Sequence, residues 1–170
     1  MSHARLSALT LQSGCQLGAG ADVPSGRSFI ALLQAFRATG GTAPGEIAGP
    51  LLEEHQVGSA VSLAKRIYTG QVFGFEWRAS LWIPMFQFDA DDLALKAHAQ
   101  RVRAQLPSQW SGWALVTWFA GPNGRLGGRH PVDMLDADLD AVMRAAQSLE
   151  TVNAFALPPV RRPHEARAQM

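Results

Sequence analysis

The fold is decided by residues Trp110–Leu135, which read WSGWALVTWFAGPNGRLGGRHPVDML. The residues up to Ala120 are strongly apolar and long enough for three helical turns, so they predict a central buried helix. Gly121-Pro122-Asn123-Gly124 stops that helix, because proline cannot continue it and the glycines favour a turn. Leu126–His130 is expected to form a glycine-rich loop, and Pro131–Leu135 a short helical turn.

The residues that follow this stretch predict one last helix, from Asp138 to about Val152. Its apolar residues fall in helical phase, and Pro158-Pro159 prevents any continuation. Asp133, Asp136, Asp138 and Asp140 resemble a calcium loop at first, but the glycine and bidentate glutamate of such a loop are missing. We interpret them as residues that cap this helix and complement its dipole.

Upstream of the central helix, Pro84–Phe88 is an apolar linker. Asp91 or Asp92 is expected to cap a helix that runs to about Leu106, where Pro107 follows. Before the linker, Val72–Trp77 and Leu81–Ile83 are short aromatic and β-branched runs around Arg78-Ala79-Ser80, which predict a β-hairpin.

The segment before the hairpin predicts three helices. Ser28 is expected to cap the first, which ends at Gly40-Gly41. Thr42 is a plausible start for the second, in which Gly49-Pro50 should weaken or kink a turn. Ser59 is expected to open the third, with Gly70 as its left-handed cap.

Composition narrows the classes of function. The 170 residues suffice for one domain or two small ones that share a core. The net charge is only +1, so charge alone does not indicate which kind of partner the protein binds. The single cysteine, Cys15, favours a reducing compartment. No stretch approaches the length of a membrane span and no signal peptide begins the chain, so a cytoplasmic protein is expected.

The sequence contains no catalytic, cofactor or metal motif. Its histidines are far apart, and none has the spacing of a metal ligand pair. Gly124–Gly128 lacks the lysine and the preceding strand of a nucleotide-binding loop, so it is interpreted as a turn. Because no nucleophile motif is present either, we expect neither enzymatic activity nor a cofactor.

A DNA-binding function is one open interpretation of the third helix. Ser59, Ser62, Lys65 and Arg66 would meet phosphates or base edges, with the hairpin as a small wing. The nearby glutamates and the scarcity of basic residues argue against it. A core-forming or dimer-forming role is an equally good interpretation of the same helix.

Two motifs resemble a known family. Pro84–Asp89 reads PMFQFD, and Trp118–Leu135 combines an aromatic helix end with Pro-Asn, Leu-Gly-Gly, Arg-x-Pro and Asp-x-Leu. Together they resemble the toxin-binding domain of the MbcA/ParS/Xre antitoxins. Glu46–Ile83 is similar to the degenerate helix-turn-helix that often precedes this domain, although Gly49-Pro50 departs from a regular first helix.

The resemblance implies a mainly helical protein, often a homodimer, that neutralises a cognate toxin, commonly of the RES-domain type that consumes NAD. The NAD chemistry would belong to the partner. A DNA-binding regulator without a toxin partner is the alternative. The candidate partner-binding residues lie in the second motif and in the C-terminal tail: Trp118, Asn123, Arg125, Leu126, Arg129, His130, Arg161 and Arg162.

The expected organisation has four parts. Residues 1–26 are interpreted as a flexible arm, and residues 27–84 as a degenerate helix-turn-helix-like module with a hairpin. Residues 85–155 form the toxin-binding domain. Residues 156–170 form a tail that is either a disordered terminus or an arm that reaches a partner. Among the tryptophans Trp110, Trp113 and Trp118, the spacing is such that Trp110, Trp113 and Leu115 cannot all point one way, so at least one large aromatic is expected near the surface or in an interface.

Overall fold

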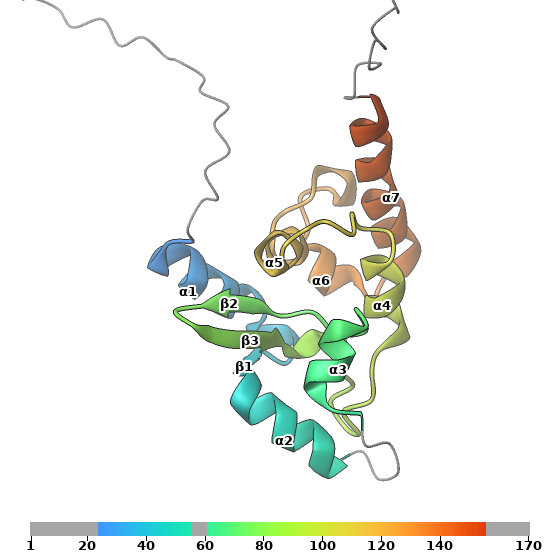
Figure 1. The fold of residues 1–170 in the computed structure, drawn as a ribbon. Coiled ribbons are helices and arrows are strands. Elements are labelled where there is room, and N and C mark those ends of the chain that lie inside the picture. The colour runs from blue at the N-terminus through green and yellow to red at the C-terminus, as the bar shows by residue number, and fades with distance from the viewer. Residues whose placement is uncertain (1–23, 56–60, 156–170) are drawn as a thin grey trace, which may run out of the picture.

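The structure, a computed structural model, describes residues 24–55 and 61–155. This part of the chain is mainly helical, as the sequence predicts, and it contains a small three-stranded antiparallel sheet (Figure 1) in place of the two-stranded hairpin alone. Its elements are α1 (Gly26–Ala35), η1 (Arg37–Thr39), β1 (Thr42–Pro44), α2 (Gly45–His55), α3 (Leu63–Tyr68), β2 (Phe75–Trp77), β3 (Ser80–Pro84), η2 (Met85–Gln87), α4 (Ala97–Arg103), α5 (Gly112–Ala120), η3 (Gly124–Leu126), α6 (Pro131–Met134) and α7 (Leu139–Phe155).

The sheet contains the predicted hairpin. The strand order is β1-β3-β2, and Phe75 pairs with Trp82 while Trp77 pairs with Ser80. The turn has two residues, Arg78 and Ala79, with φ angles of 48° and 62°. Two successive positive φ angles are typical of the type I′ turn that matches the twist of a hairpin. The turn is therefore shorter than expected, because Ser80 already belongs to β3.

The helix expected to start at Thr42 begins at Gly45 instead. Thr42, Ala43 and Pro44 form β1, which pairs with β3 at the edge of the sheet. The residue before a proline is biased towards extended backbone, and an edge strand tolerates a proline, so both effects favour the strand. The α2 helix then continues through Pro50 to His55.

The caps of α1 and α3 also differ from those expected. Ser25 caps α1, since its Oγ accepts a hydrogen bond from the backbone N of Ser28. Ser62 caps α3, which has only six residues. Each serine predicted as a cap has another serine three residues away, so the sequence leaves the choice ambiguous. Gly70 has a φ of +71°, as expected of a left-handed residue after the helix.

The helix expected from Asp91 or Asp92 to Leu106 is shorter, and α4 begins at Ala97. The carboxylates of Asp89 and Asp92 accept hydrogen bonds from the backbone N of Asp91 and of Ala94. Such local side-chain bonds compete with helix formation. Residues 88–95 accordingly form a turn, closed by an antiparallel bridge between Phe88 and Leu95.

The predicted order from the central helix onwards is confirmed. Ser111 caps α5, and α6 begins at Pro131. Gly127 and Gly128 have φ angles of 66° and 82°, which glycine adopts at little cost. The Asp138 carboxylate accepts a hydrogen bond from the backbone N of Ala141, so it caps α7 as interpreted.

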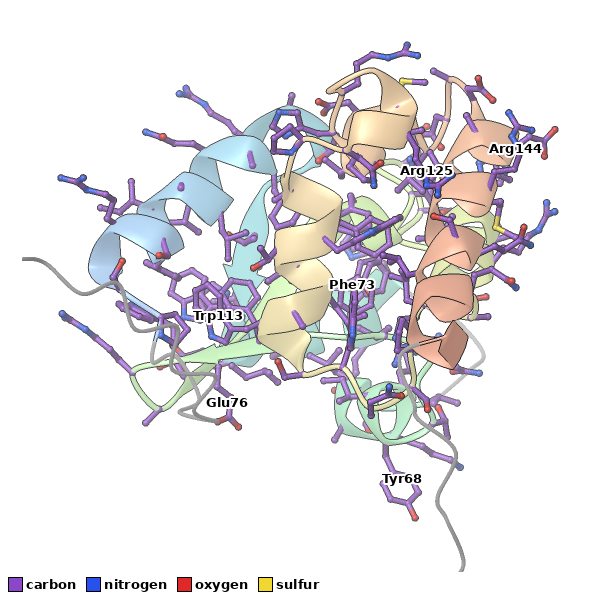
Figure 2. The ribbon with its side chains drawn as sticks, turned by 90° about the horizontal axis from the view of Figure 1, so that it is seen from above. Tyr68, Phe73, Glu76, Trp113, Arg125 and Arg144 are labelled. Atoms are coloured by element: carbon purple, nitrogen blue, oxygen red, sulfur yellow. The ribbon has the colours of Figure 1, made fainter. Side chains whose placement is uncertain are left out.

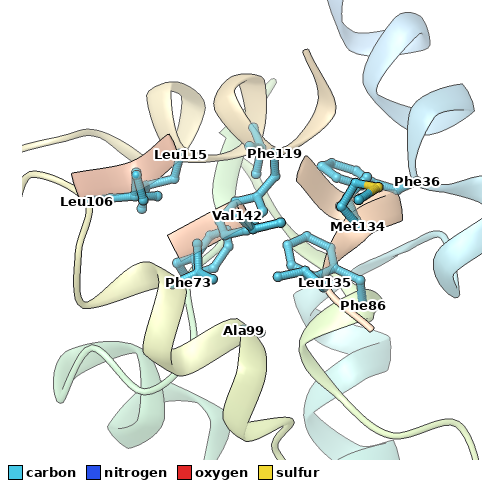
Figure 3. Close-up of a cluster of buried hydrophobic side chains, with 14 of the residues drawn as sticks. Phe36, Phe73, Phe86, Ala99, Leu106, Leu115, Phe119, Met134, Leu135 and Val142 are labelled. Carbon is cyan, nitrogen blue, oxygen red and sulfur yellow. The ribbon is translucent and has the colours of Figure 1, made fainter. Parts of the chain in front are cut away.

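The main hydrophobic core joins elements from both sides of residue 84. Phe119 packs against Phe73 and Phe86, with ring centroids 5.5 Å and 4.9 Å away, and Phe36 packs on Phe86 in the same cluster. Figure 3 shows these side chains with those of α6 and α7. A second, smaller cluster links α2 and α3 to β3. The predicted modules therefore share the larger core.

The tryptophans of the second half lie near the surface, as expected for at least one of them. Trp110, Trp113 and Trp118 are each half-buried against the main core. Trp113 also donates its indole N–H to the carbonyl oxygen of Glu76, 2.7 Å away, and so ties α5 to β2. Within residues 24–55 and 61–155, no helix has the length and apolar character that a bilayer crossing requires.

Candidate protein-binding surface

The loop between α5 and α6 is closed by Asn123. The Asn123 side chain accepts a hydrogen bond from the Arg125 backbone N at 2.9 Å. The backbone carbonyl oxygen of Asn123 accepts from the backbone amides of Leu126, at 3.0 Å, and Gly128, at 2.9 Å. The backbone amide of Asn123 donates to the carbonyl oxygen of Arg129 at 3.0 Å. Asn123 is thus a structural residue that fixes the shape of the loop.

Five successive amides of the loop are not available to a phosphate. The backbone N–H groups of residues 125 to 129 all donate to oxygens inside the loop, from Asn123, Gly124 and Leu126. A phosphate-binding loop instead turns several free N–H groups towards its ligand. The interpretation of this glycine-rich run as a turn agrees with that geometry.

Leu126 holds the loop against the core. Its side chain is only 3 % exposed and belongs to the cluster that includes Val132 and Val142. The η3 turn that carries it packs against α7. Leu126 therefore anchors the loop and does not offer its side chain to a partner in this conformation.

Two predicted arginines and one that the sequence did not single out lie on the outside of this region. Arg125 and Arg129 in the loop and Arg144 on α7 are all exposed. Figure 2 shows Arg125 and Arg144 on the same side of the molecule, on elements that pack together. Among the described residues, no carboxylate lies within ion-pair distance of any of the three. We call Arg125, Arg129 and Arg144 the arginine surface.

The arginine surface rests on a fixed support. The Arg129 Nε donates to the Leu126 carbonyl oxygen at 3.2 Å, which folds this side chain over the loop. Arg144 lies on the outer face of α7, opposite the buried Val142 and Ala146. The apolar phase of α7 places Arg144 on that outer face, but only the packing of η3 on α7 brings it near the loop.

His130 and Trp118 belong to the support rather than to the exposed surface. The His130 Nδ1 lies 2.6 Å from the carbonyl oxygen of Ala120. Because a carbonyl only accepts, Nδ1 donates here and satisfies the last turn of α5. The Trp118 ring packs edge-on against Phe119 at 5.0 Å, and its indole nitrogen is buried without a protein partner.

An ion-pair cluster joins the end of α6 to α4. The Asp136 Oδ2 lies 2.9 Å from the Lys96 Nζ, and its Oδ1 lies 3.4 Å from the His98 Nδ1. The hydrogen bond from Lys96 is the main reason why the pKa of Asp136 is lowered. Asp136 therefore links two elements, whereas the sequence interpretation assigned it to the capping of α7.

The Asp136→Asn substitution is expected to make stability less sensitive to acid. A carboxyl with a lowered pKa in the folded state stabilises the fold above its unfolded-state pKa, and this stabilisation is lost as pH falls through the folded-state pKa. Since Asp136 is largely exposed, the loss should not exceed about 1 kcal/mol. Urea unfolding at pH 7 and pH 3 measures it. An equal pH dependence in wild type and variant would contradict this role.

The candidate DNA-binding residues that the structure describes offer few exposed hydrogen-bond donors to a phosphate. The Ser62 Oγ already accepts from the Lys65 backbone N as the cap of α3, and the Arg66 Nε donates to the Val61 carbonyl oxygen at 3.3 Å. Lys65 is exposed, and Arg66 is half-buried. Ser59 lies outside the described residues, as do Arg161 and Arg162 of the tail.

Comparison of the chain with protein-family profiles, with curated proteins and with solved structures finds no match. Among the described residues, no group of three or more histidine, cysteine or acidic side chains is arranged to hold a metal ion.

Proposed function

We propose that this chain is an antitoxin-like cytoplasmic protein that binds a cognate toxin through the arginine surface and neutralises it. One observation carries the proposal: among the described residues, three exposed guanidinium groups have no acidic partner, two of them on a loop whose amides from residue 125 to residue 129 are internally bonded, and the third on α7 beside it. The backbone of the loop is preorganised by these bonds, so little backbone ordering cost is added when a partner binds. In line with the sequence resemblance, the toxin would be of the RES-domain type that consumes NAD.

The chemistry of the arginine surface fits an acidic face of a partner protein. Arginine forms paired hydrogen bonds with carboxylates, and exposed complementary charges steer association and fix its orientation. Neutralisation then requires only that the bound antitoxin obstructs the toxin. The antitoxin itself contributes no reacting group, and any NAD is bound by the toxin.

DNA binding through α3 is the alternative, and the geometry favours it less. A phosphate-contacting helix needs several free donors, whereas the Ser62 hydroxyl is used as a cap and Arg66 is half-buried. The exposed carboxylates of Glu53 and Glu54 on α2 add negative charge to this half. A gel shift on the promoter of its own gene with Lys65→Ala tests this alternative, which requires a clear loss of affinity.

Charge reversal is expected to break the complex. With the product of the neighbouring reading frame as the partner, the double variant Arg125→Glu, Arg144→Glu should bind at least about 30-fold more weakly, since truncating one member of a buried charge pair costs about 2–5 kcal/mol. Calorimetry measures the affinity. Wild-type binding should also weaken as salt rises.

Lys65→Glu is the matched control for this experiment. It makes the same kind of charge reversal at one position of α3, half the total change of the double variant. This helix lies far from the arginine surface in Figure 2, where Tyr68 marks it. This variant should bind like the wild type. The function is wrong if the wild type forms no complex, and the surface is wrong if both charge reversals weaken binding equally.

A further inference from the structure

A groove between α1 and α5 has no occupant within the described residues. It has a volume of about 610 Å³ and is lined by residues that include Pro24, Ala31, Ala35, Trp113, Ala114 and Thr117. Leu32 lies among the lining residues and is almost fully buried, while Ala31 and Thr117 are exposed. Figure 2 shows Trp113 beside α5, on the side that faces α1. The groove is thus an open apolar channel between two helices.

The groove begins where the described part of the chain begins. Pro24 is the first described residue and also one of the lining residues, so residues 1–23 are attached to the chain at the groove. None of the described residues that line it is charged. An occupant with charged side chains would lose hydration there without gaining a partner.

The N-terminal segment matches these requirements. From Leu6 to Ala21 the sequence LSALTLQSGCQLGAGA contains no charged residue, and Leu6, Leu9 and Leu11 supply apolar side chains. The C-terminal tail does not match, because Arg161, Arg162, Glu165 and Arg167 carry charges. We propose that the segment around Leu6–Leu11 folds back and packs into the groove between α1 and α5 of its own chain.

The tether is long enough for this. Residues 12–23 form a linker rich in glycine, alanine and serine, whose root-mean-square span is about 19 Å. The nine residues of α5 extend over only about 13 Å. A tethered segment of this length has an effective concentration in the millimolar range, well above that of a second copy of the chain in dilute solution.

The unique Cys15 makes the proposal directly testable in the full chain. It is the only cysteine and lies four residues after Leu11, so a nitroxide on its thiol reports on the segment without further substitution. In NMR spectra of the isotope-labelled protein, the nitroxide is expected to broaden the amide signals of Ala31, Ala35 and Ala114, which should lose most of their intensity. The signals of Lys65 and Tyr68 on α3 should keep theirs.

A variant with Leu6, Leu9 and Leu11 replaced by serine separates docking from mere proximity of the tether. Its folded core is untouched, and the broadening at Ala114 should disappear. Equal broadening in this variant and in the wild type would overturn the proposal. A second control mixes nitroxide-labelled chains that carry no isotope with isotope-labelled chains that carry no nitroxide. Broadening in this mixture would mean that the segment of a second copy occupies the groove, and it would also overturn the proposal.

Discussion

Replacing Gly112 by alanine is expected to destabilise the protein by about 3 kcal/mol or more. A Cβ atom at Gly112 would overlap the carbonyl oxygen of Gly74 and lie 3.1 Å from the Cα of Phe75. Both are backbone atoms, so no side chain can rotate away to relieve the clash. The start of α5 and the approach to β2 would have to separate, which disturbs the packing of Phe75 against Trp113.

Thermal unfolding measures this effect. For a chain of this size, each kcal/mol corresponds to about 2–4 °C in Tm, so a fall of about 6–12 °C is expected. Gly124→Ala is the matched control, because nothing lies within 4 Å of its added Cβ and its φ is not positive. A Tm for Gly112→Ala within about 2 °C of the wild type would show that α5 and β2 do not approach this closely.

The second large effect is expected at Gln87, the one polar or charged residue that is buried among the described residues. Its Oε1 accepts from the Phe73 backbone N at 2.9 Å, and its Nε2 donates to the carbonyl oxygens of Phe73, at 2.8 Å, and Pro84, at 3.0 Å. The side chain thus replaces a missing strand partner for the chain that leads into β2.

Gln87→Leu should cost about 3–5 kcal/mol, because it leaves three backbone groups unpaired and each such group costs about 1–3 kcal/mol. Urea unfolding monitored by tryptophan fluorescence measures the free energy. The control is Gln109→Leu, since Gln109 is exposed and a change there should be close to neutral. Equal stabilities of the two variants would contradict the structural role of Gln87.

Much of the fold was predictable because its signals are local. The hairpin, the central helix, the glycine pair at Gly127 and Gly128, and the proline start of α6 each follow from residues within a few positions of one another. The errors are local as well, and they arise where two serines compete for one cap or where aspartates bond to nearby amides in place of a helix. The helix start predicted at Thr42 was wrong for a longer-range reason, because Thr42 pairs with Pro84 of β3.

The candidate site was predictable only in part. The motif directs attention to Arg125 and Arg129, but it treats Asn123, Leu126 and His130 in the same way, although these three hold the loop in place. Arg144 joins Arg125 and Arg129 in the arginine surface through the packing of α7 on η3, which no local sequence pattern predicts. The contacts of Gln87 are equally distant in sequence, since Phe73 lies fourteen residues away.

The shared core has a practical consequence for mapping the interaction. Because Phe73 lies outside residues 85–155 and packs on Phe119 of α5, an isolated fragment of residues 85–155 would expose one side of α5 to water. Such a fragment should aggregate or bind other proteins non-specifically through its exposed apolar surface. Its pull-downs would then report non-specific hydrophobic contacts instead of specific binding. The binding surface is therefore better mapped by point substitutions in the intact chain than by a series of deletions.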